Sequence, residues 1–202
     1  TVVFHTSVTG GRLASEKIIL AAGDIEIESR LVINSAGLSA QAVVATLSGF
    51  DRNFIPPLYL AKGNYFSLSG KSPFSRLVYP MPEPGGLGIH FTLDLAGAGR
   101  FGPDVEWIDS PDYDVDGARG AVFSDRIKRY WPGLNPEMLH AAYAGIRPKI
   151  ERPGGSSTDF IIQGPAQHGC PGFINLFGIE SPGLTASLAI AEYVGEMSAS
   201  IK

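Results

Sequence analysis

The sequence has little cysteine, no run of basic residues and no long apolar stretch. Cys170 is its single cysteine, so an internal disulfide is excluded, and no Cys/His spacing indicates a zinc site. A net charge of −4 without a basic cluster argues against nucleic acid as a partner. No segment approaches the roughly 18 apolar residues that a transmembrane helix needs. These absences leave a globular protein, and the lone thiol favours a reducing compartment.

The first ten residues, TVVFHTSVTG, alternate like a strand and lack the charged-then-apolar layout of a signal peptide. We therefore expect a cytoplasmic location, with peripheral attachment to a membrane left open. The sequence also begins without methionine and inside a strand-like pattern. We expect it to belong to a longer gene product.

Apolar residues make up 44% of the chain and charged residues 18%, which is enough to bury a sizeable core. The expected strands cluster instead of alternating one for one with helices, and this order predicts an α+β fold. The expected strands are 2–8, 17–20, 25–33, 59–68, 76–79, 88–93, 141–148, 160–163 and 173–177, with a turn at Gly10-Gly11 and helices at 40–47, 122–131 and 183–200.

Residues 97–102, GAGRFG, match the dinucleotide-binding pattern G-x-G-x-x-G. That pattern binds a pyrophosphate only where a buried strand precedes it and a helix begins within it. Here Pro103-Asp104 follow directly, so we interpret the segment as a hairpin turn.

Two strand ends look suited to a ligand. The first is LVINSAG, residues 31–37, where a strand ends in small residues before a helix; a plain packing turn is the alternative. The second is GIESPGLTASLAI, residues 178–190, where Pro182 suits a first helical position. No acid occupies that first turn, and Gly183 leaves backbone N–H groups uncovered for an anion, although packing could explain this as well.

Three further residues have alternative interpretations. Arg147, fixed in extended geometry by Pro148, suits a clamp on a carboxylate or is an ordinary exposed arginine. His90 faces opposite to Ile89 and Phe91, either toward solvent or toward a cavity where imidazole acts as a general base. Lys62, beside Gly63 inside a strand, indicates either close approach by a ligand or a protective edge lysine.

Five blocks together resemble the D-amino-acid-oxidase-like family of FAD-dependent oxidoreductases, in its 2-hydroxyglutarate-oxidising branch. They occur in the order of the family and cover nearly the whole chain. The blocks are LVINSAGLSA, YLAKGNYFSL, LVYPMPEPGGLGIHFTLDLAGAGRFGPDVEW, YAGIRPKI and LFGIESPGLTASLAIAEYV.

The resemblance implies site residues and FAD as the cofactor. Arg147 matches the family arginine that holds the substrate carboxylate, and His90 matches a histidine expected to accept the hydroxyl proton. Lys62, Tyr79 and Lys149 are further expected substrate contacts. Residues expected beside FAD are Val8, Asn34, Ala36, Gly37, Gly178, Ser181, Pro182, Gly183, Leu184 and Thr185. No metal is expected.

The resemblance also implies the domain organisation and the reaction. Residues 1–55 and 151–202 are expected to belong to an FAD-binding α/β domain, and 56–150 to a substrate domain with a mainly antiparallel mixed sheet and helices on one face. The family's N-terminal G-x-G-x-x-G unit is absent from this sequence, so we expect weak binding of FAD by the chain alone. The implied reaction is hydride transfer from a 2-hydroxy acid, L-2-hydroxyglutarate foremost, to flavin. An amino-acid or glycine-type oxidase and a non-catalytic binding domain are the alternatives, and the electron acceptor is unknown.

Overall fold

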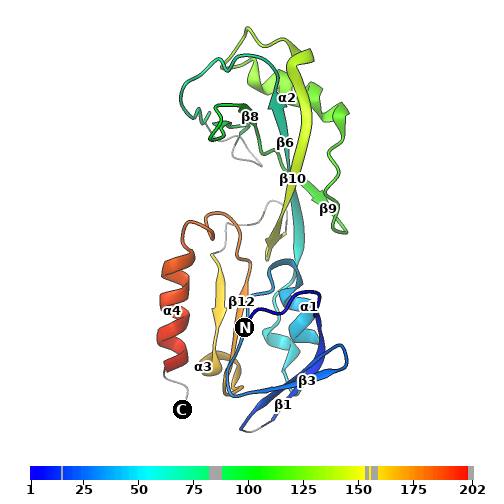
Figure 1. Ribbon diagram of the computed structural model, residues 1–202, viewed down its shortest axis with the longest axis vertical. Helices are drawn as coiled ribbons and strands as arrows, with labels where there is room; N and C mark the ends of the chain where they lie inside the picture. Colours follow the sequence, from blue (N-terminus) through cyan, green and yellow to red (C-terminus); the bar gives the residue numbers. More distant parts are fainter. Residues whose placement is uncertain (15, 82–87, 153–154, 156–158, 200–202) are drawn as a thin grey trace. The chain divides into compact units, whose positions relative to one another are not determined.

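The computed structural model describes residues 1–14, 16–81, 88–152, 155 and 159–199. Contacts divide the chain into two compact units (Figure 1). Unit 1 consists of Thr1–Leu58, Pro148–Arg152 and Ser156–Lys202, and unit 2 of Tyr59–Arg147 and Pro153–Gly155. Each unit is described by itself below.

Unit 1 contains a small sheet with a helix on each face. Its order is β11 (Ile161–Gln163), β12 (Phe173–Phe177) and β4 (Val32–Asn34), with β12 antiparallel to β11 and parallel to β4. Phe173 and Phe177 pack in one cluster with helix α1 (Ala40–Ala45), whereas Ile174 and Leu176 pack in another with helix α4 (Ser187–Ala199). Since β12 is buried on both faces, it reads FINLF without a polar-to-apolar alternation.

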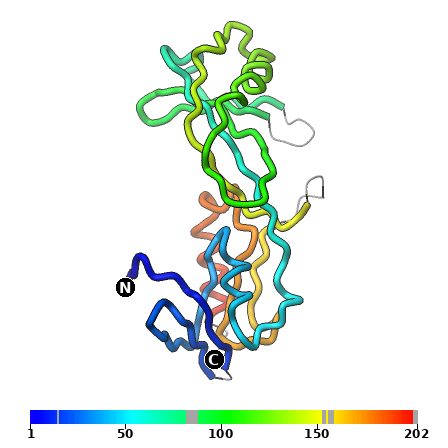
Figure 2. The backbone as a smooth tube through the Cα atoms, turned by 90° about the vertical axis from the view of Figure 1, so that its right-hand side faces the viewer, coloured from blue at the N-terminus to red at the C-terminus, as the bar shows by residue number. Residues whose placement is uncertain are grey.

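A second sheet of unit 1 contains a meander of three strands, and its bounds differ from two of the expectations above. Its order is β3 (Ile25–Ser29), β2 (Ile18–Ala22), β1 (Val8–Leu13) and β5 (Leu47–Ser48), visible at the blue end of Figure 2. The strand expected at 2–8 is wrong, because β1 begins only at Val8. The turn expected at Gly10-Gly11 is also wrong: both glycines lie inside β1, and a Cβ on Gly11 would come within 2.3 Å of the Ile19 carbonyl oxygen. Glycine here permits close approach of β2.

Unit 2 is built on a five-stranded sheet with antiparallel pairs. The order is β10 (Leu139–Lys149), β6 (Tyr59–Leu68), β8 (Gly99–Phe101) and β7 (Phe91–Leu93), while β9 (Glu106–Ile108) also pairs with β6. The remaining short elements of the chain are α2 (Gly120–Ile127), α3 (Pro165–His168), and single 3₁₀ turns at Gly37–Ser39, Arg52–Phe54, Gly117–Arg119 and Pro136–Met138.

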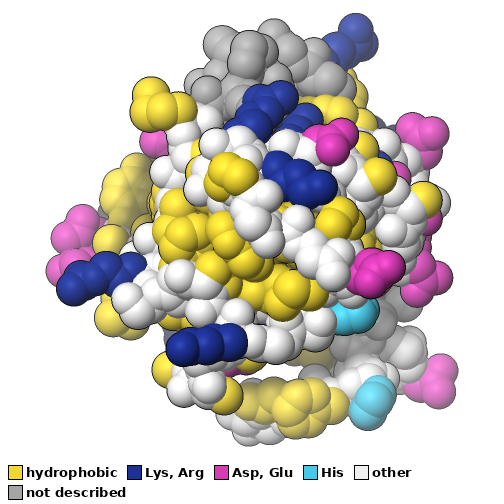
Figure 3. Space-filling model, turned by 90° about the horizontal axis from the view of Figure 1, so that it is seen from above, with side chains coloured by type: hydrophobic (Ala, Val, Ile, Leu, Met, Phe, Trp, Pro, Cys, Tyr) yellow, Lys and Arg dark blue, Asp and Glu magenta, His cyan; other side chains and the backbone are white. Residues whose placement is uncertain are grey.

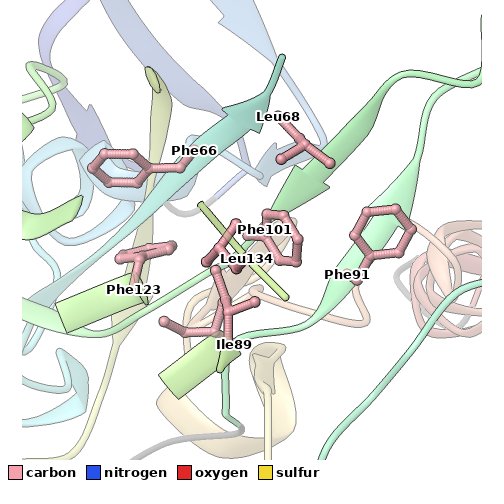
Figure 4. Packing of buried hydrophobic residues seen from close by; sticks show 8 residues of the cluster. Phe66, Leu68, Ile89, Phe91, Phe101, Phe123 and Leu134 are labelled. Carbon is pink, nitrogen blue, oxygen red and sulfur yellow. The ribbon is translucent and has the colours of Figure 1, made fainter. Parts of the chain in front are cut away.

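The core of unit 2 lies on one face of this sheet (Figure 4). Phe66 pairs with Phe101 across β6 and β8, and Phe101 pairs with Phe91 across β8 and β7, so three buried rings lie side by side. Phe123 of α2 packs on Phe66, with ring centroids 4.5 Å apart. Gly99 makes room for this layer, because a Cβ there would lie 2.7 Å from the Phe91 ring.

The α+β class is confirmed. A hairpin joins β7 to β8 (Figure 4), but the expectation that residues 97–102 form its turn is wrong. The turn itself covers Asp94–Gly97, where the Gly97 N–H donates to the Asp94 carbonyl, and Gly99 already belongs to β8. The strand expected at 76–79 is wrong, because an isolated bridge from Val78 to Phe91 is all that forms there.

The closing helix begins later than expected, at Ser187. The Gly183 N–H donates to the Glu180 carbonyl at 2.5 Å, so residues 181–186 form turns before the helix starts. Pro182 is therefore not the first residue of this helix. The expected end of the helix at residue 200 lies outside the described residues. Residues 82–87, which belong to the third block of the resemblance, also lie outside them. Within the described ranges, no helix is long and apolar enough to cross a membrane.

Candidate active site

The second face of the unit 2 sheet, opposite to the core, carries a row of polar and aromatic side chains. Neighbouring residues of a strand point to opposite faces, and residues paired across two strands point to the same face. Ser67 is paired with Arg100, and Arg100 with Thr92. Each of the three is the sequence neighbour of a core phenylalanine and therefore points to the face opposite to the core. Tyr65, two residues before Ser67, shares their face. We call this the open face of unit 2.

His90 and Tyr79 lie on the open face as a stacked pair. The bridge between Val78 and Phe91 sets Tyr79 opposite His90, and their ring centroids lie 4.0 Å apart with an interplanar angle of 11°. The His90 carbonyl accepts a hydrogen bond from the Gly102 N–H at 2.9 Å. The hydroxyl of Tyr130 donates to the adjacent Ile89 carbonyl at 3.0 Å, from the core side. The backbone that presents the imidazole is therefore held on both sides.

A second aromatic pair joins β6 to β10. The rings of Tyr65 and Tyr143 stack with centroids 4.5 Å apart and an interplanar angle of 11°, and the Arg100 guanidinium lies 5.7 Å from the Tyr143 centroid. Burial raises the pKa of Tyr65, with further increases from the phenols of Tyr143 and Tyr79, while the nearby Arg147 guanidinium lowers it. Of these three groups, Tyr143 is in ring contact with Tyr65, whereas the charges of Tyr79 and Arg147 act on Tyr65 over a longer range.

Neither Tyr65 nor Tyr143 is among the site residues predicted from the sequence. A signal was available for Tyr65, because a tyrosine that alternates with the buried Phe66 must face away from the core. Tyr143 carries no comparable signal, since its neighbours in β10 are mostly small and exposed. Its contact with Tyr65 depends on the pairing of two strands that are far apart in the sequence.

Lys62 does not join this group. It lies on the core face of β6, an even number of residues from Phe66, and its side chain is 3% exposed. The ammonium donates to Asp112 Oδ2 at 2.6 Å and to the carbonyl of Asp114, and this contact with Lys62 is the main cause of a lowered Asp112 pKa. Contact between Lys62 and a substrate stays a prediction, and it would have to compete with Asp112.

Unit 1 contains a cavity of about 500 Å³ between the ends of β4 and β12 and helix α4. Gly37 and Gly183, both predicted cofactor neighbours, line it together with Ser35 and Ser187, and the rest of the lining is mainly apolar. Gly37 has a positive φ of 58°, and a Cβ there would meet nothing within 4 Å. This volume and the small residues suit the close approach of a flat, largely apolar group with polar edges.

Asn34 shapes the loop beside this cavity through its side chain. Its Nδ2 donates to the Ala40 carbonyl and to Asn175 Oδ1, both at 2.9 Å, and the Ala36 N–H donates to Asn34 Oδ1 at 3.4 Å. Asn34 and Asn175 are both buried. The pair therefore fixes how the chain leaves β4, and any contact of Asn34 with a cofactor stays a prediction.

The other predicted residues of unit 1 are scattered around this region. Gly178 follows β12 at a φ of 68°, with the Ile150 side chain 3.1 Å from where a Cβ would be. Lys149 forms an ion pair of 2.5 Å with Glu180 in the loop after β12. Leu184 is 91% exposed, within the turns that also contain Ser181, Pro182 and Thr185. Val8 starts β1 and is not part of the cavity lining.

In the part of the chain that the structure describes, no group of three His, Cys, Asp or Glu side chains is arranged to hold a metal ion. On the surface drawn in Figure 3, side chains of both charge signs and apolar side chains share the same face. Among the described residues, unit 1 offers a ligand a cavity lined by small and apolar residues. Unit 2 offers aromatic, imidazole and guanidinium groups on its open face.

Residues 1–197 match the family described as DAO: FAD dependent oxidoreductase. This chain belongs to that family. Among curated proteins it is 46% identical, over 219 residues, to the mitochondrial L-2-hydroxyglutarate dehydrogenase of Arabidopsis thaliana. That match covers 96% of this chain and 45% of the plant protein.

Solved structures give the same fold. L-alpha-glycerophosphate oxidase of Mycoplasma pneumoniae, solved with FAD bound, matches with a TM-score of 0.78 and 21% identity over 96% of this chain and 50% of that one. Glycine oxidase of Bacillus cereus matches with a TM-score of 0.69 and 12% identity over 98% and 50%. At these identities the likeness shows the fold alone. The chain spans about half the length of the relatives it matches.

Proposed function

We propose that this chain supplies the substrate-binding sheet and part of the cofactor-binding layer of an FAD-dependent enzyme that oxidises a 2-hydroxy acid to the 2-oxo acid. The observation that carries the proposal is the stacked Tyr79–His90 pair on the open face, together with Arg147 on β10, the strand whose Tyr143 stacks on Tyr65. The 46% identity to a plant L-2-hydroxyglutarate dehydrogenase supports L-2-hydroxyglutarate as the substrate.

Each side chain has a distinct proposed role. The guanidinium of Arg147 binds the C1 carboxylate through two parallel hydrogen bonds, which fixes the plane of that group. His90 accepts the proton of the substrate hydroxyl while the carbon that bears this hydroxyl loses a hydride. The alcohol therefore loses two electrons and two hydrogens in total. Tyr79, stacked at 4.0 Å, keeps the imidazole ring in one plane. The sheet thus orients the acid and removes one proton.

FAD fits the residues of unit 1. Gly37 and Gly183 allow close approach of backbone, and the cavity that they line has an apolar wall. We propose that the loop after β4, with Asn34, Ala36 and Gly37, lies beside the pyrophosphate. The segment from Gly178 to Thr185 then lies beside the ring system, and Val8 near the adenine. When bound, FAD supplies the acceptor for the hydride.

A dicarboxylate substrate needs a second cation for its far carboxylate. Lys149 and Lys62 are the proposed candidates, and both are held by carboxylates in the structure, at 2.5 Å by Glu180 and 2.6 Å by Asp112. Binding of a distal carboxylate at either lysine would therefore exchange one ion pair for another. Lys149 is the more accessible of the two, with 27% of its side chain exposed against 3% for Lys62.

The decisive experiment is a substrate panel on the complete gene product loaded with FAD. We expect oxidation of L-2-hydroxyglutarate to 2-oxoglutarate, with little turnover of the D-isomer, of glycine and other amino acids, or of glycerol 3-phosphate. Preferred turnover of amino acids would replace this proposal by the amino-acid oxidase alternative. Absence of flavin absorbance at about 450 nm in the purified protein would favour a non-catalytic binding domain.

Two further measurements address the electron acceptor and the location. Assays of the same gene product with oxygen and with a quinone identify the acceptor. We keep the cytoplasm as the predicted location and peripheral membrane attachment as its alternative, while the plant relative is designated mitochondrial. Fractionation of the native host distinguishes these compartments.

A further inference from the structure

The open face of unit 2 holds one phenol that the proposed mechanism does not use. Tyr65 lies in the middle of β6, and the register of Phe66 with Phe101 fixes the strand on either side of it. Its ring is partly buried and stacks on Tyr143 at 4.5 Å. A tyrosine in such a position has its ring orientation fixed while its hydroxyl still needs a partner.

The stack is itself held from the far side. Arg100 lies over the Tyr143 ring at 5.7 Å, and its guanidinium donates to Asp94 Oδ2 at 2.9 Å. Asp94 is in turn fixed by the N–H groups of Ala96 and Ala98, each at 2.9 Å. These contacts run from the turn between β7 and β8 to Tyr65, so the position of this phenol is determined by rigid strands and one tight turn.

Beyond Tyr143, β10 carries a glycine with open space above it among the described residues. Tyr143, Gly145 and Arg147 are alternate residues of β10 and share one strand face. A Cβ built on Gly145 would meet nothing within 4 Å, and Gly145 has no positive φ that requires glycine. Neither backbone conformation nor packing in the described chain therefore accounts for a glycine between the tyrosine and the arginine.

We propose that Tyr65 is a further substrate-binding residue and that the acid lies over Gly145, with one carboxylate held between the Tyr65 hydroxyl and the Arg147 guanidinium. The hydroxyl donates a hydrogen bond to a carboxylate oxygen that the guanidinium leaves unpaired. Gly145 lies beneath the carbon chain, where a side chain would occupy the place of the substrate. This inference rests on the proposed oxidation of a 2-hydroxy acid and adds two residues to its site.

The raised pKa of Tyr65 supports this role. Burial and the neighbouring phenols disfavour the phenolate, so the hydroxyl remains a donor at the pH where an ordinary tyrosine begins to ionise. A phenolate beside a substrate carboxylate would repel it.

The test compares Tyr65→Phe with Tyr143→Phe in the complete FAD-loaded gene product. Both variants keep the stacked rings and each removes one hydroxyl. We expect Tyr65→Phe to raise the KM for L-2-hydroxyglutarate about 10- to 100-fold, as for a lost hydrogen bond to a charged group, with a smaller effect on kcat. Tyr143→Phe should leave KM within about twofold of the wild type. An unchanged KM in Tyr65→Phe, or equal increases in both variants, would overturn the proposal.

A second variant, Gly145→Val, tests the position of the carbon chain. Because a Cβ at this position meets no described protein atom within 4 Å, we expect normal folding and flavin content together with a KM at least about tenfold higher. A normal KM in this variant would refute the placement of the acid over Gly145.

Binding of glutarate, a non-reactive dicarboxylate, separates this inference from the proposed reaction. Its Kd is measured through the change it causes in the flavin spectrum. If 2-hydroxy acids are not oxidised but Tyr65→Phe and Gly145→Val weaken glutarate binding, the proposed reaction fails and the site stands. If the acids are oxidised and glutarate binds equally to all variants, the reaction stands and the site fails.

Discussion

The two units use their sheets in different ways. In unit 1, β12 is buried on both faces between α1 and α4, and the cavity beside it is lined by apolar side chains together with glycines and serines. In unit 2, the second half of β6, from Tyr65 to Leu68, alternates between buried residues on one face and half-buried residues on the other, where Tyr65 stacks on Tyr143. The cavity of unit 1 therefore offers apolar side chains and the backbone of small residues, whereas the second half of β6 offers aromatic and polar side chains. We infer that unit 1 recognises its proposed ligand mainly through apolar and backbone contacts, and unit 2 mainly through aromatic and polar side chains.

The largest expected effect tests whether the two cores are independent. Phe101 belongs to the unit 2 cluster and Phe173 to a unit 1 cluster, and both are fully buried. Replacement of either by alanine should lower the free energy of unfolding by about 3–5 kcal/mol. Hydrogen exchange of the complete gene product should show the loss of protection in β8 for Phe101→Ala and in β12 for Phe173→Ala. Equal loss in both strands from one variant would mean that the cores unfold together.

The next effect concerns recognition by side chains in unit 2. Arg147→Met keeps the length of the side chain and removes the cation, which should cost about 2–4 kcal/mol of substrate binding and raise KM roughly 30- to 1000-fold. Flavin content should not change, because the cavity with its predicted cofactor neighbours lies in unit 1. Steady-state kinetics measure the effect, with Arg129→Met, at an exposed position in the turn after α2, as the control. An unchanged KM would remove Arg147 from the site.

A smaller effect concerns the backbone loop of unit 1. Asn34→Ala leaves the buried Asn175 Oδ1 and the Ala40 carbonyl without their donor, so we expect a loss of about 1–3 kcal/mol of stability and a lower affinity for FAD. Chemical denaturation and flavin titration measure the two effects. The double variant Asn34→Leu/Asn175→Leu should recover part of the stability without recovering flavin affinity. Recovery of both would mean that the asparagine pair acts on stability alone.

The smallest effect is the pH dependence of unit 1. Burial lowers the pKa of His168, whose ring lies against Phe50 and Phe173 and whose Nδ1 accepts the Cys170 N–H at 3.2 Å. Below about pH 6.5 the unfolded chain therefore binds a proton that the folded chain does not yet bind. Stability should be complete above this pH and should decrease as the pH falls, by at most about 1.4 kcal/mol per pH unit.

The measurement is chemical denaturation between about pH 7 and 5, the range around an ordinary histidine pKa. His168→Phe should flatten the pH dependence, whereas His5→Gln, at an exposed position, serves as the control. If both variants follow the wild-type curve, His168 is not the group responsible.

The sequence predicts some elements at their observed bounds and misplaces others for identifiable reasons. β6 and β12 match because Pro56-Pro57 and Gly178 delimit strong apolar strands. β1 does not, because a glycine pair such as that in SVTGGRL is typical of a turn, whereas Gly11 here permits the close contact with β2. The start of α4 depends on a bond from the Gly183 N–H to the Glu180 carbonyl, which the local pattern of apolar residues does not reveal.

The candidate site shows the same limit. Alternation in GIHFT is sufficient to point His90 away from the core, and the structure adds its stacking partner, Tyr79. The contacts of Lys62 with Asp112 and of Tyr65 with Tyr143 join segments 50 and 78 residues apart by their numbering, so no local pattern could predict them. Sequence reasoning thus identifies which residues are chemically suitable, and only the strand register separates those on the open face from those on the core face.

The alternation of Phe66 and Tyr65 along β6 constrains how this protein can change over evolutionary time. Replacement of Tyr65 or Ser67 alters only the open face, so the recognised acid can change while the core remains intact. Insertion or deletion of one residue before Phe66 would instead turn every side chain of the strand to the opposite face, with the phenylalanine exposed and the tyrosine in the core. Relatives that act on different acids should therefore differ by substitution within β6 and keep its length constant.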